Sequence, residues 1–320
     1  MEQLAITDHV RNCAYAVYAV MLAATLFVCL AEWIFRKEMA NFKLRLKSFW
    51  LIVILFTVTF AVNKGFAFFF LALICYLALK EFISLIPTRR ADRRVLLWAY
   101  LAIPIQFYLI YIHWIVTFYL FVPLYMFLLV PMRMVWIGDN EGFLKACGTI
   151  HWGLMSTVYS LGYLAAYLSL PVETNPAGGA VGMLLCILIL TVFNDFAQFF
   201  FGKSLGRRKI IPKVSPNKTC EGLIGGVIAT TIMALFLVPY LTPSGSFVLA
   251  AGAGFVIAVA GFLGDVTMSA IKRDIGVKDS GTLLPGHGGI LDRLDSLVFT
   301  APLFFHYTVF LNKIDVYVPF

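Results

Sequence analysis

Long apolar runs dominate this sequence and constrain what it can fold into. They lie at about 15–35, 49–63, 66–79, 95–112, 115–131, 152–171, 180–201, 222–241, 247–266 and 296–312. A helix needs roughly 20 apolar residues to cross the hydrocarbon core of a bilayer. Of the 320 residues, 61% are hydrophobic and 13% are charged, whereas soluble domains carry about 25% charged residues. The sequence therefore predicts an all-α, polytopic integral membrane protein with about ten transmembrane helices, and excludes a soluble enzyme or a disordered scaffold.

The distribution of Lys and Arg supports these spans and predicts their orientation. Five alternating loops hold 22 of the 25 basic residues; they are 36–48, 80–94, 132–151, 202–221 and 267–295. Because cytoplasmic loops carry an excess of Lys and Arg, we expect these loops to be cytoplasmic and both termini to lie outside. The net charge of +8 indicates contact with anionic lipid headgroups and no nucleic-acid partner. A compact chain without a recognisable targeting peptide fits a bacterial inner membrane best.

The chain divides into two regions of different character, 1–190 and 191–320. The first consists mostly of apolar helices joined by plain basic loops. The second concentrates polar chemistry: residues 194–296 hold seven of the 17 acidic residues and ten of the 25 basic ones. These residues lie in or beside the predicted cytoplasmic loops 202–221 and 267–295. The sequence thus predicts an active site at the cytoplasmic end of the C-terminal helices, where mixed charge suits a metal ion together with phosphates.

The first polar segment surrounds loop 202–221. Asp195 lies six residues inside the end of an apolar run, about 9 Å deep in a regular helix. A carboxylate at that depth is costly and is therefore a functional candidate, although an ion pair with a loop cation is the alternative. The cations and hydroxyls of the loop suit phosphate binding, and on charge alone they suit lipid headgroups equally well. The candidate phosphate-binding residues here are Asn194, Asp195, Lys203, Lys213, Ser215, Lys218 and Thr219.

The second polar segment contains three spaced aspartates. Asp265 closes one predicted span, whereas Asp292 and Asp295 open the next and, being three residues apart, share a helix face. Carboxylate oxygens with few His or Cys nearby suit Mg²⁺, which proteins usually hold with one or two carboxylates plus substrate phosphates. We therefore predict Asp265, Asp292 and Asp295 as metal ligands. The alternative for Asp292 is helix capping and an ion pair with Arg293.

A glycine-rich run precedes these aspartates, at Pro285-Gly286-His287-Gly288-Gly289. Glycine backbone can approach an anion closely through its N–H groups. His287 has no second His or Cys near it in sequence, so a structural or phosphate-contacting role is favoured over metal binding. The predicted catalytic residues are Asp265, Lys272, Arg273 and Asp292, and the predicted phosphate-binding residues of this segment are Lys278, His287, Gly288 and Arg293.

A stretch of 27 residues, from Ser269 to Asp295, matches a family signature in full. The signature reads Ser-x-apolar-Lys-Arg, four residues, Lys-Asp-x-small, two residues, then apolar-Pro-Gly-His-Gly-Gly-apolar-x-Asp-Arg-apolar-Asp. In this the chain resembles the phosphatidate cytidylyltransferase family, the CDP-diacylglycerol synthases. The upstream stretch from Asn194 to Gly222 also resembles that family, so the likeness covers roughly 190–305.

The resemblance implies a reaction in which a lipid phosphate such as phosphatidate attacks the α-phosphorus of CTP, giving a CDP-lipid and pyrophosphate. It also implies Mg²⁺ at the positions of Asp265 and Asp292, with a second cation such as K⁺ beside it. A phosphate monoester is already ionised near neutral pH, so the chemistry needs positioning and charge neutralisation more than a strong base. The expected partners are CTP, phosphatidate and membrane lipid, and a homodimer is consistent with the resemblance.

Three positions depart from the family pattern. Gln198-Phe199 stands where Ala-Tyr is common, Cys220 where Trp is common, and Met268 where an acidic Glu is common. These departures leave two alternatives open, a CTP-dependent transferase or kinase acting on another lipid or lipid phosphate, and a non-catalytic lipid-binding paralogue. A transporter is disfavoured, because transporters place polar groups near the membrane midplane on several helices.

Overall fold

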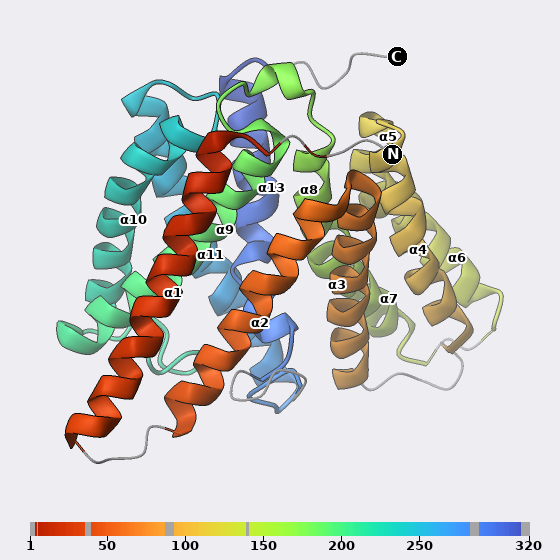
Figure 1. Ribbon diagram of the computed structural model, residues 1–320. Coiled ribbons are helices and arrows are strands. Elements are labelled where there is room, and N and C mark those ends of the chain that lie inside the picture. Colours follow the sequence, from red (N-terminus) through yellow and green to blue (C-terminus); the bar gives the residue numbers. More distant parts are fainter. Residues whose placement is uncertain are drawn as a thin grey trace.

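The computed structural model describes residues 4, 6–35, 40–86, 93–138, 141–281 and 288–314, and within these ranges the chain is helical, with an isolated β-bridge and no strand (Figure 1). In chain order the helices are α1 (Asp8–Phe35), α2 (Ala40–Val62), α3 (Lys64–Leu85), α4 (Arg93–Tyr111), α5 (Ile115–Leu120), η2 (Phe121–Met126), α6 (Phe127–Val135), α7 (Phe143–Gly153), η3 (Leu154–Tyr159), α8 (Ser160–Leu168), η4 (Val172–Thr174), α9 (Gly179–Ser204), α10 (Cys220–Leu241), α11 (Phe247–Asp274), α12 (Leu291–Leu294) and α13 (Leu297–Leu311). The predicted all-α class is confirmed.

Nine helical segments in the described part of the chain are long and apolar enough to cross a membrane. They account for nine of the ten predicted runs and confirm a polytopic membrane protein. Some extend beyond the predicted bounds: α2 begins at Ala40 and carries Lys43, Arg45 and Lys47 among its first eight residues. Long cationic side chains can reach the membrane surface while their stems cover apolar helix, so a basic first turn does not shorten the span.

The remaining predicted run, 152–171, folds inside the protein. It lies in α7, η3 and α8, which follow one another without a break from Phe143 to Leu168. All nine residues of α8 are buried, and so are Ser156 and Thr157 in η3. The Thr157 hydroxyl donates to the carbonyl oxygen of Gly153 at 2.7 Å, which satisfies it within the helix. This segment is covered by protein and not by lipid, so it tolerates polar residues that lower its mean hydropathy.

Two short turns join neighbouring helices, and local chemistry explains both. Asn63 caps the start of α3 by accepting the backbone N–H of Phe66 at 2.8 Å, directly after the last residue of α2. His113 adopts a left-handed conformation with φ of 58° between α4 and α5. Both turns are only a few residues long, so the chain reverses its direction along the bundle at each, and the helices that the turn joins contact each other.

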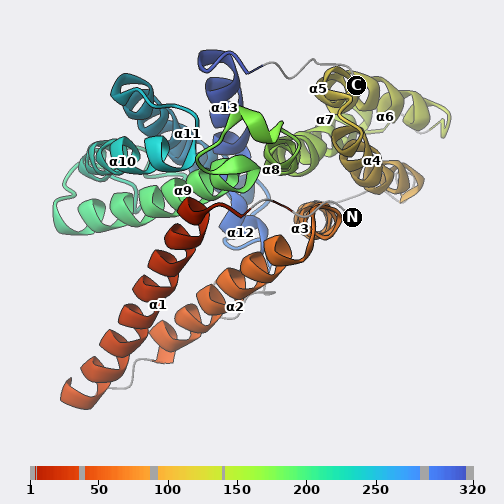
Figure 2. The same cartoon turned by 45° about the horizontal axis from the view of Figure 1, so that its top comes forward.

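Helices α9, α10, α11 and α13 pack together and form the part of the fold that supports the polar segments. Small residues permit close approach of their backbones. A Cβ added at Gly222 of α10 would lie 2.8 Å from the carbonyl oxygen of Gln198 in α9, and one at Gly254 of α11 would lie 2.7 Å from Thr231 of α10. In contrast, α1 and α2 project from the rest of the molecule and are mostly exposed (Figure 2).

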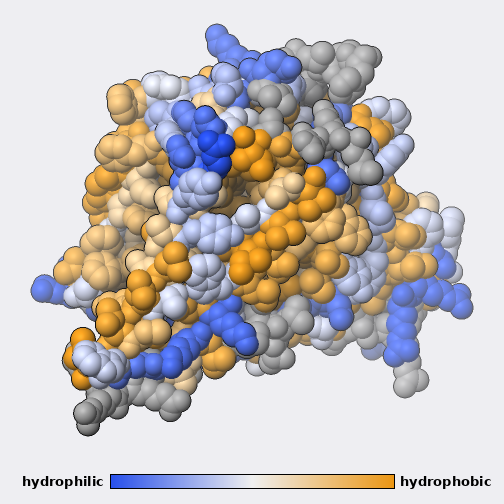
Figure 3. Space-filling view, in the orientation of Figure 1, coloured by the Kyte–Doolittle hydropathy of each residue, from blue (hydrophilic) through white to orange (hydrophobic). Residues whose placement is uncertain are grey.

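The alternating chain direction gathers the predicted basic loops at one end of the bundle. Helices α1, α3, α6, α9 and α11 end there, at the bottom of Figure 1, and α2, α4, α7, α10 and α12 begin there. Hydrophilic residues lie toward the two ends of the molecule, with a hydrophobic band between them (Figure 3). The alternation of loops agrees with the Lys and Arg pattern, and the assignment of this basic end to the cytoplasm stays a prediction.

The division into 1–190 and 191–320 also stays a prediction. Its boundary falls inside α9, and helices of the two regions pack against each other: α8 contacts α13, and α3 contacts α12. The C-terminal polar segments therefore rest partly on helices of the first region.

Candidate active site

The two polar segments meet at the basic end of the bundle. Asp195 and Asp265 each lie nine residues before the end of their helices, α9 and α11, and Asp292 and Asp295 lie where the chain forms α12 and α13. The two segments contact each other directly. The Ser296 hydroxyl donates to Asp195 Oδ1 at 2.9 Å, and these residues are 101 positions apart in the sequence. Antiparallel packing brings these helix ends together, as we expected from the alternation of spans.

Lys218 is the cation at the centre of this group. Its Nζ lies 2.5 Å from Asp265 Oδ2 and donates to Gln198 Oε1 at 3.1 Å. The same ammonium lies 5.7 Å from the centre of the Phe262 ring. The other oxygen of Asp265 accepts the Ser269 hydroxyl at 3.3 Å. The ammonium of Lys218 thus stands against the carboxylate that the sequence predicted as a cation ligand.

The loop that delivers Lys218 is closed by backbone hydrogen bonds. Lys209 and Thr219 form the isolated β-bridge, and the Glu221 carboxylate accepts the N–H groups of Arg207 and Arg208 at 3.0 and 3.2 Å. These contacts fold residues 206–221 back on themselves. The turn places Lys218 over the ends of α9 and α11 and leaves the other loop cations exposed.

Asp195, Asp265 and Asp295 lie close enough to interact electrostatically. Asp295 Oδ1 accepts the backbone N–H of Ser296 at 2.8 Å. Counting Asp292, four carboxylates face three cationic side chains, those of Lys218, Lys272 and Arg293, so carboxylates outnumber cations in the site. Among the described residues no three acidic, His or Cys side chains form a ready metal site. The donor oxygens fit a hard cation such as Mg²⁺ in their chemistry, since that ion keeps several waters and substrate oxygens as ligands.

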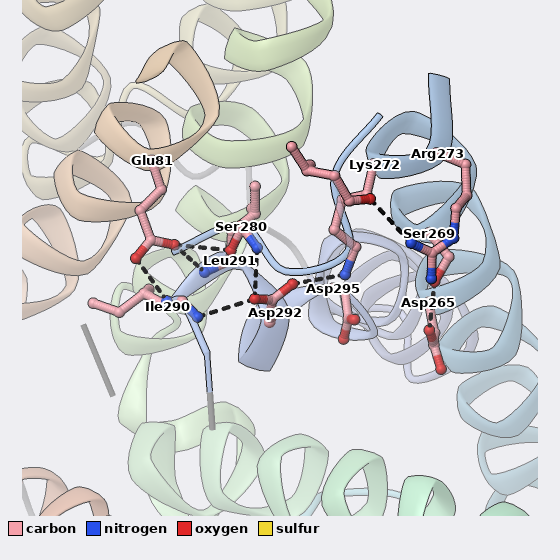
Figure 4. A network of polar contacts seen from close by, with 12 residues as sticks. Glu81, Asp265, Ser269, Lys272, Arg273, Ser280, Ile290, Leu291, Asp292 and Asp295 are labelled. Atoms are coloured by element: carbon pink, nitrogen blue, oxygen red, sulfur yellow. Dashed lines mark hydrogen bonds and ion pairs between the residues drawn. The ribbon is translucent and has the colours of Figure 1, made fainter. Parts of the chain in front are cut away.

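Asp292 is fully engaged by the protein (Figure 4). Its Oδ1 accepts Lys272 Nζ at 2.7 Å, and its Oδ2 accepts the backbone N–H groups of Ser280 at 2.8 Å and Gly289 at 2.9 Å. Its ion-pair partner is thus Lys272, and the alternative pair with Arg293 stays a prediction. The carboxylates that lie near Asp265 are Asp195 and Asp295. The observed contacts of Asp292 give it a positioning role, and metal binding by it stays a prediction.

Glu81, at the end of α3, is a site residue that the sequence analysis missed. Its carboxylate accepts the backbone N–H groups of Ile290 and Leu291, both at 2.9 Å, and the hydroxyl of Ser280 at 3.1 Å (Figure 4). The partners are 199 to 210 positions away in the sequence. The available signal was weak, an acidic residue where an apolar run meets a basic loop.

Two glycines allow these carboxylates to approach the backbone. Gly288 has φ of +82°, and a Cβ there would lie 2.7 Å from Asp292 Oδ2. A Cβ at Gly289 would overlap the Ser280 hydroxyl and the Glu81 carboxylate. The sequence predicted that glycine N–H groups approach an anion here, and in this structure the anion is the protein's own Asp292. The predicted substrate contact of Gly288 stays a prediction, and His287 lies outside the described residues.

Two predicted phosphate-binding residues have structural partners instead. Asn194 is fully buried, donates to the carbonyl oxygen of Ala258 at 3.3 Å and accepts the Thr230 hydroxyl at 3.2 Å, so it joins α9, α10 and α11. Thr219 is also buried and caps α10 by accepting the N–H of Gly222 at 3.1 Å. Both residues therefore serve helix packing, and substrate binding by them stays a prediction.

The remaining predicted cations lie on the exposed surface around the site. Arg273 donates to the carbonyl oxygen of Val214 at 3.4 Å and of Val277 at 3.0 Å, which links the two polar loops. Ser215 is half-buried. The exposed members of the predicted set are Lys203, Lys213, Lys278 and Arg293. They form a positively charged surround to a centre rich in carboxylates.

Comparison with known proteins identifies the family. The sequence model of the cytidylyltransferase family matches residues 43–311, which includes both polar segments and the helices from α2 to α13. This chain belongs to the cytidylyltransferase family. It is therefore a nucleotidyltransferase by family, as the motif from Ser269 to Asp295 indicated, and its apolar helices make it a multi-pass membrane protein.

Individual relatives extend this result. The chain is 46% identical over 291 residues to the uncharacterized protein YnbB of Escherichia coli (strain K12), covering 91% of this chain and 95% of that one. It is 38% identical over 151 residues to a phosphatidate cytidylyltransferase of Staphylococcus aureus (strain COL), covering 47% of this chain and 55% of that enzyme. A phosphatidate cytidylyltransferase of Haemophilus influenzae is 38% identical over 157 residues. The chain spans about half the length of these two enzymes.

Proposed function

We propose that the protein transfers a cytidylyl group from CTP to phosphatidate, giving CDP-diacylglycerol and pyrophosphate for phospholipid synthesis. The observation that carries this proposal is the cluster of Asp195, Asp265 and Asp295 around Lys218, beside the Lys272–Asp292 pair, at the basic end of the helices. Relatives named phosphatidate cytidylyltransferase support it, since they match about half of the chain.

The positions of the cations suit a reaction between two anions. The attacking oxygen belongs to a phosphate that is ionised near neutral pH, so the site needs no strong general base. Lys218 and Lys272 lie within the carboxylate cluster, and the exposed Lys203, Lys213 and Arg273 surround it. A positive surround concentrates anionic substrates and reduces their mutual repulsion as they approach. A site at helix ends lets the lipid headgroup reach the nucleotide while its tails stay in the bilayer.

We propose that Mg²⁺ binds at Asp265 and Asp295 together with Asp195, whose carboxylate lies beside them. When bound, the ion would polarise the α-phosphate and stabilise the pyrophosphate leaving group. The surplus of carboxylates also suits a second, monovalent cation such as K⁺. We assign Asp292 to positioning, because both of its oxygens already accept hydrogen bonds.

The reaction is tested with the purified protein in detergent, supplied with Mg²⁺, labelled CTP and phosphatidate. We expect label in the lipid phase and an equimolar release of pyrophosphate. A lipid kinase would instead release CDP and leave no cytidine in the lipid. Asp265→Asn should abolish turnover. Asp8→Asn should not change it, because Asp8 lies at the start of α1, at the end of the bundle opposite the basic loops. Absence of labelled lipid from a folded preparation would overturn the proposal.

A second candidate keeps the reaction and changes the lipid. Gln198, which departs from the family pattern, accepts a hydrogen bond from Lys218, and buried Met268 leaves that position of α11 without a carboxylate. Both departures adjoin the proposed site. Competition between phosphatidate and lipid phosphates that lack glycerol would decide between the candidates, because the preferred lipid has the higher kcat/KM.

We also propose that the basic end faces the cytoplasm of a bacterial inner membrane. The alternation of the basic loops supports this orientation. Lys209→Cys, in the exposed loop before α10, should react with a membrane-impermeant thiol reagent only after the cytoplasmic side is opened. Labelling of that cysteine in sealed cells would reverse the orientation.

A further inference from the structure

Glu81 connects the first region of the chain to the signature segment of the second. It lies on α3, whose neighbouring residues Leu79 and Phe82 are each 1% exposed, so the helix end that carries the carboxylate is anchored in the core. A Cβ at Gly153 of α7 would overlap the Phe82 ring, which shows how closely α3 packs there. A carboxylate on such a helix has a defined position and can orient what it binds.

Two carboxylates share the donors of the signature segment. Ser280 donates its backbone N–H to Asp292 and its hydroxyl to Glu81. Gly289 donates its N–H to Asp292, and Ile290 and Leu291 donate theirs to Glu81. Ser280 on one side and residues 289–291 on the other are therefore held between the carboxylates of Glu81 and Asp292, an arrangement called the clamp below (Figure 4).

This clamp continues into the proposed catalytic cations. Asp292 accepts Lys272 Nζ at 2.7 Å, and the chain of contacts runs Glu81, Ser280, Asp292, Lys272. A shift of Ser280 or of the 289–291 backbone would move the Asp292 carboxylate and with it the Lys272 ammonium. Misplacement of a catalytic group by about 1 Å can reduce the rate 100-fold.

We propose that Glu81 is a positioning residue of the active site, which sets the geometry of the signature segment and, through Asp292, that of Lys272. This inference rests on the proposed function for its kinetic consequence. Among the described residues, the donors to the Glu81 carboxylate are groups of the protein itself, namely Ser280 Oγ and the N–H groups of Ile290 and Leu291. The first region of the chain thus contributes to the site through α3.

The test uses Glu81→Gln in the full-length protein in detergent. A glutamine keeps the size of the side chain but turns one acceptor into an NH₂ donor that faces N–H and O–H donors. We expect hydrogen exchange at the amides of residues 290 and 291 to become about tenfold faster, the effect of losing one hydrogen bond to a charged acceptor. We expect kcat for cytidylyl transfer to fall about tenfold or more, with KM for CTP within threefold of the original.

Controls separate positioning from folding and from the proposed reaction. Ser280→Ala removes one donor only and should show the same pattern with a smaller change, so it remains informative if Glu81→Gln fails to fold. Asp8→Asn, in an exposed ion pair, should alter neither readout. Exchange at residues 290 and 291 does not depend on activity, so an inactive wild type would leave the clamp testable. Unchanged exchange together with kcat within twofold in both variants would overturn the inference.

Discussion

Asp292→Asn tests the centre of the site most sharply. The substitution keeps the shape of the side chain but removes its charge. If the new NH₂ group replaces Oδ1, a donor faces the Lys272 ammonium, and if it replaces Oδ2, a donor faces the N–H groups of Ser280 and Gly289. Neither orientation restores all three contacts. The side chains of Lys272 and Asp292 are 11% and 6% exposed, so solvent compensates little.

The size of the effect follows from that burial. Removing one partner of a buried ion pair costs about 3–5 kcal/mol, because the other charge is left uncompensated. The lower value applies here, since asparagine still accepts one or two of the three hydrogen bonds, depending on its orientation. With an unfolding entropy of about 2.1 cal/mol/K per residue, 1 kcal/mol corresponds to about 1.5 °C in a chain of 320 residues, so the melting temperature should fall by about 4–5 °C. Lys272→Met in the Asp292→Asn background should recover part of this loss, with a coupling of about 1 kcal/mol or more.

The assay is thermal unfolding of the four proteins of this double-mutant cycle in detergent, with cytidylyl transfer measured alongside. Asp8→Asn is the matched control, because Arg11 Nη2 lies 2.7 Å from Asp8 Oδ1, the same separation as in the Lys272–Asp292 pair, with the side chains 54% and 75% exposed. Its melting temperature should stay within about 1 °C. A loss for Asp292→Asn no larger than for this control, or additive effects of the two substitutions, would refute the reasoning.

Three further predictions address other residues of the site. Gly289→Ala should reduce activity about 100-fold, because the new Cβ would overlap Ser280 and Glu81. Gly148→Ala should not reduce it, because the space around Gly148 is open. Equal activities of the two variants would contradict the clamp. Asn194→Ala should lower the free energy of unfolding by about 1–3 kcal/mol, since it leaves the buried hydroxyl of Thr230 without its acceptor. The KM for CTP should stay unchanged, and a raised KM would indicate that Asn194 binds substrate. Chelation of divalent cations should abolish transfer, and added Mg²⁺ should restore it in the original protein but not in Asp265→Asn. Equal restoration of transfer in the two proteins would exclude Asp265 as a ligand.

Several features of this protein could be predicted from its sequence because they depend on short windows of chain. Within a bilayer an apolar run of about 20 residues satisfies its backbone hydrogen bonds as a helix, and nine of the ten runs correspond to helices in the described part of the chain that are long and apolar enough to cross a membrane. The alternation of basic loops orders the helix ends, and the motif from Ser269 to Asp295 identifies the family. The turns at Asn63 and His113 also depend on local chemistry.

Other features depended on which helices pack together. Hydropathy does not show whether lipid or protein surrounds a helix. Run 152–171 was therefore predicted to cross the membrane like the other runs, although α8, which it contains, is wholly buried in the protein. Similarly, the sequence marked Asn194 and Lys218 as polar in one segment, yet one joins three helices and the other pairs with Asp265. Glu81 is part of the site only because α3 packs against α12. Hydrogen bonds between residues about 200 positions apart follow from the packing of whole helices, and no local pattern specifies that packing.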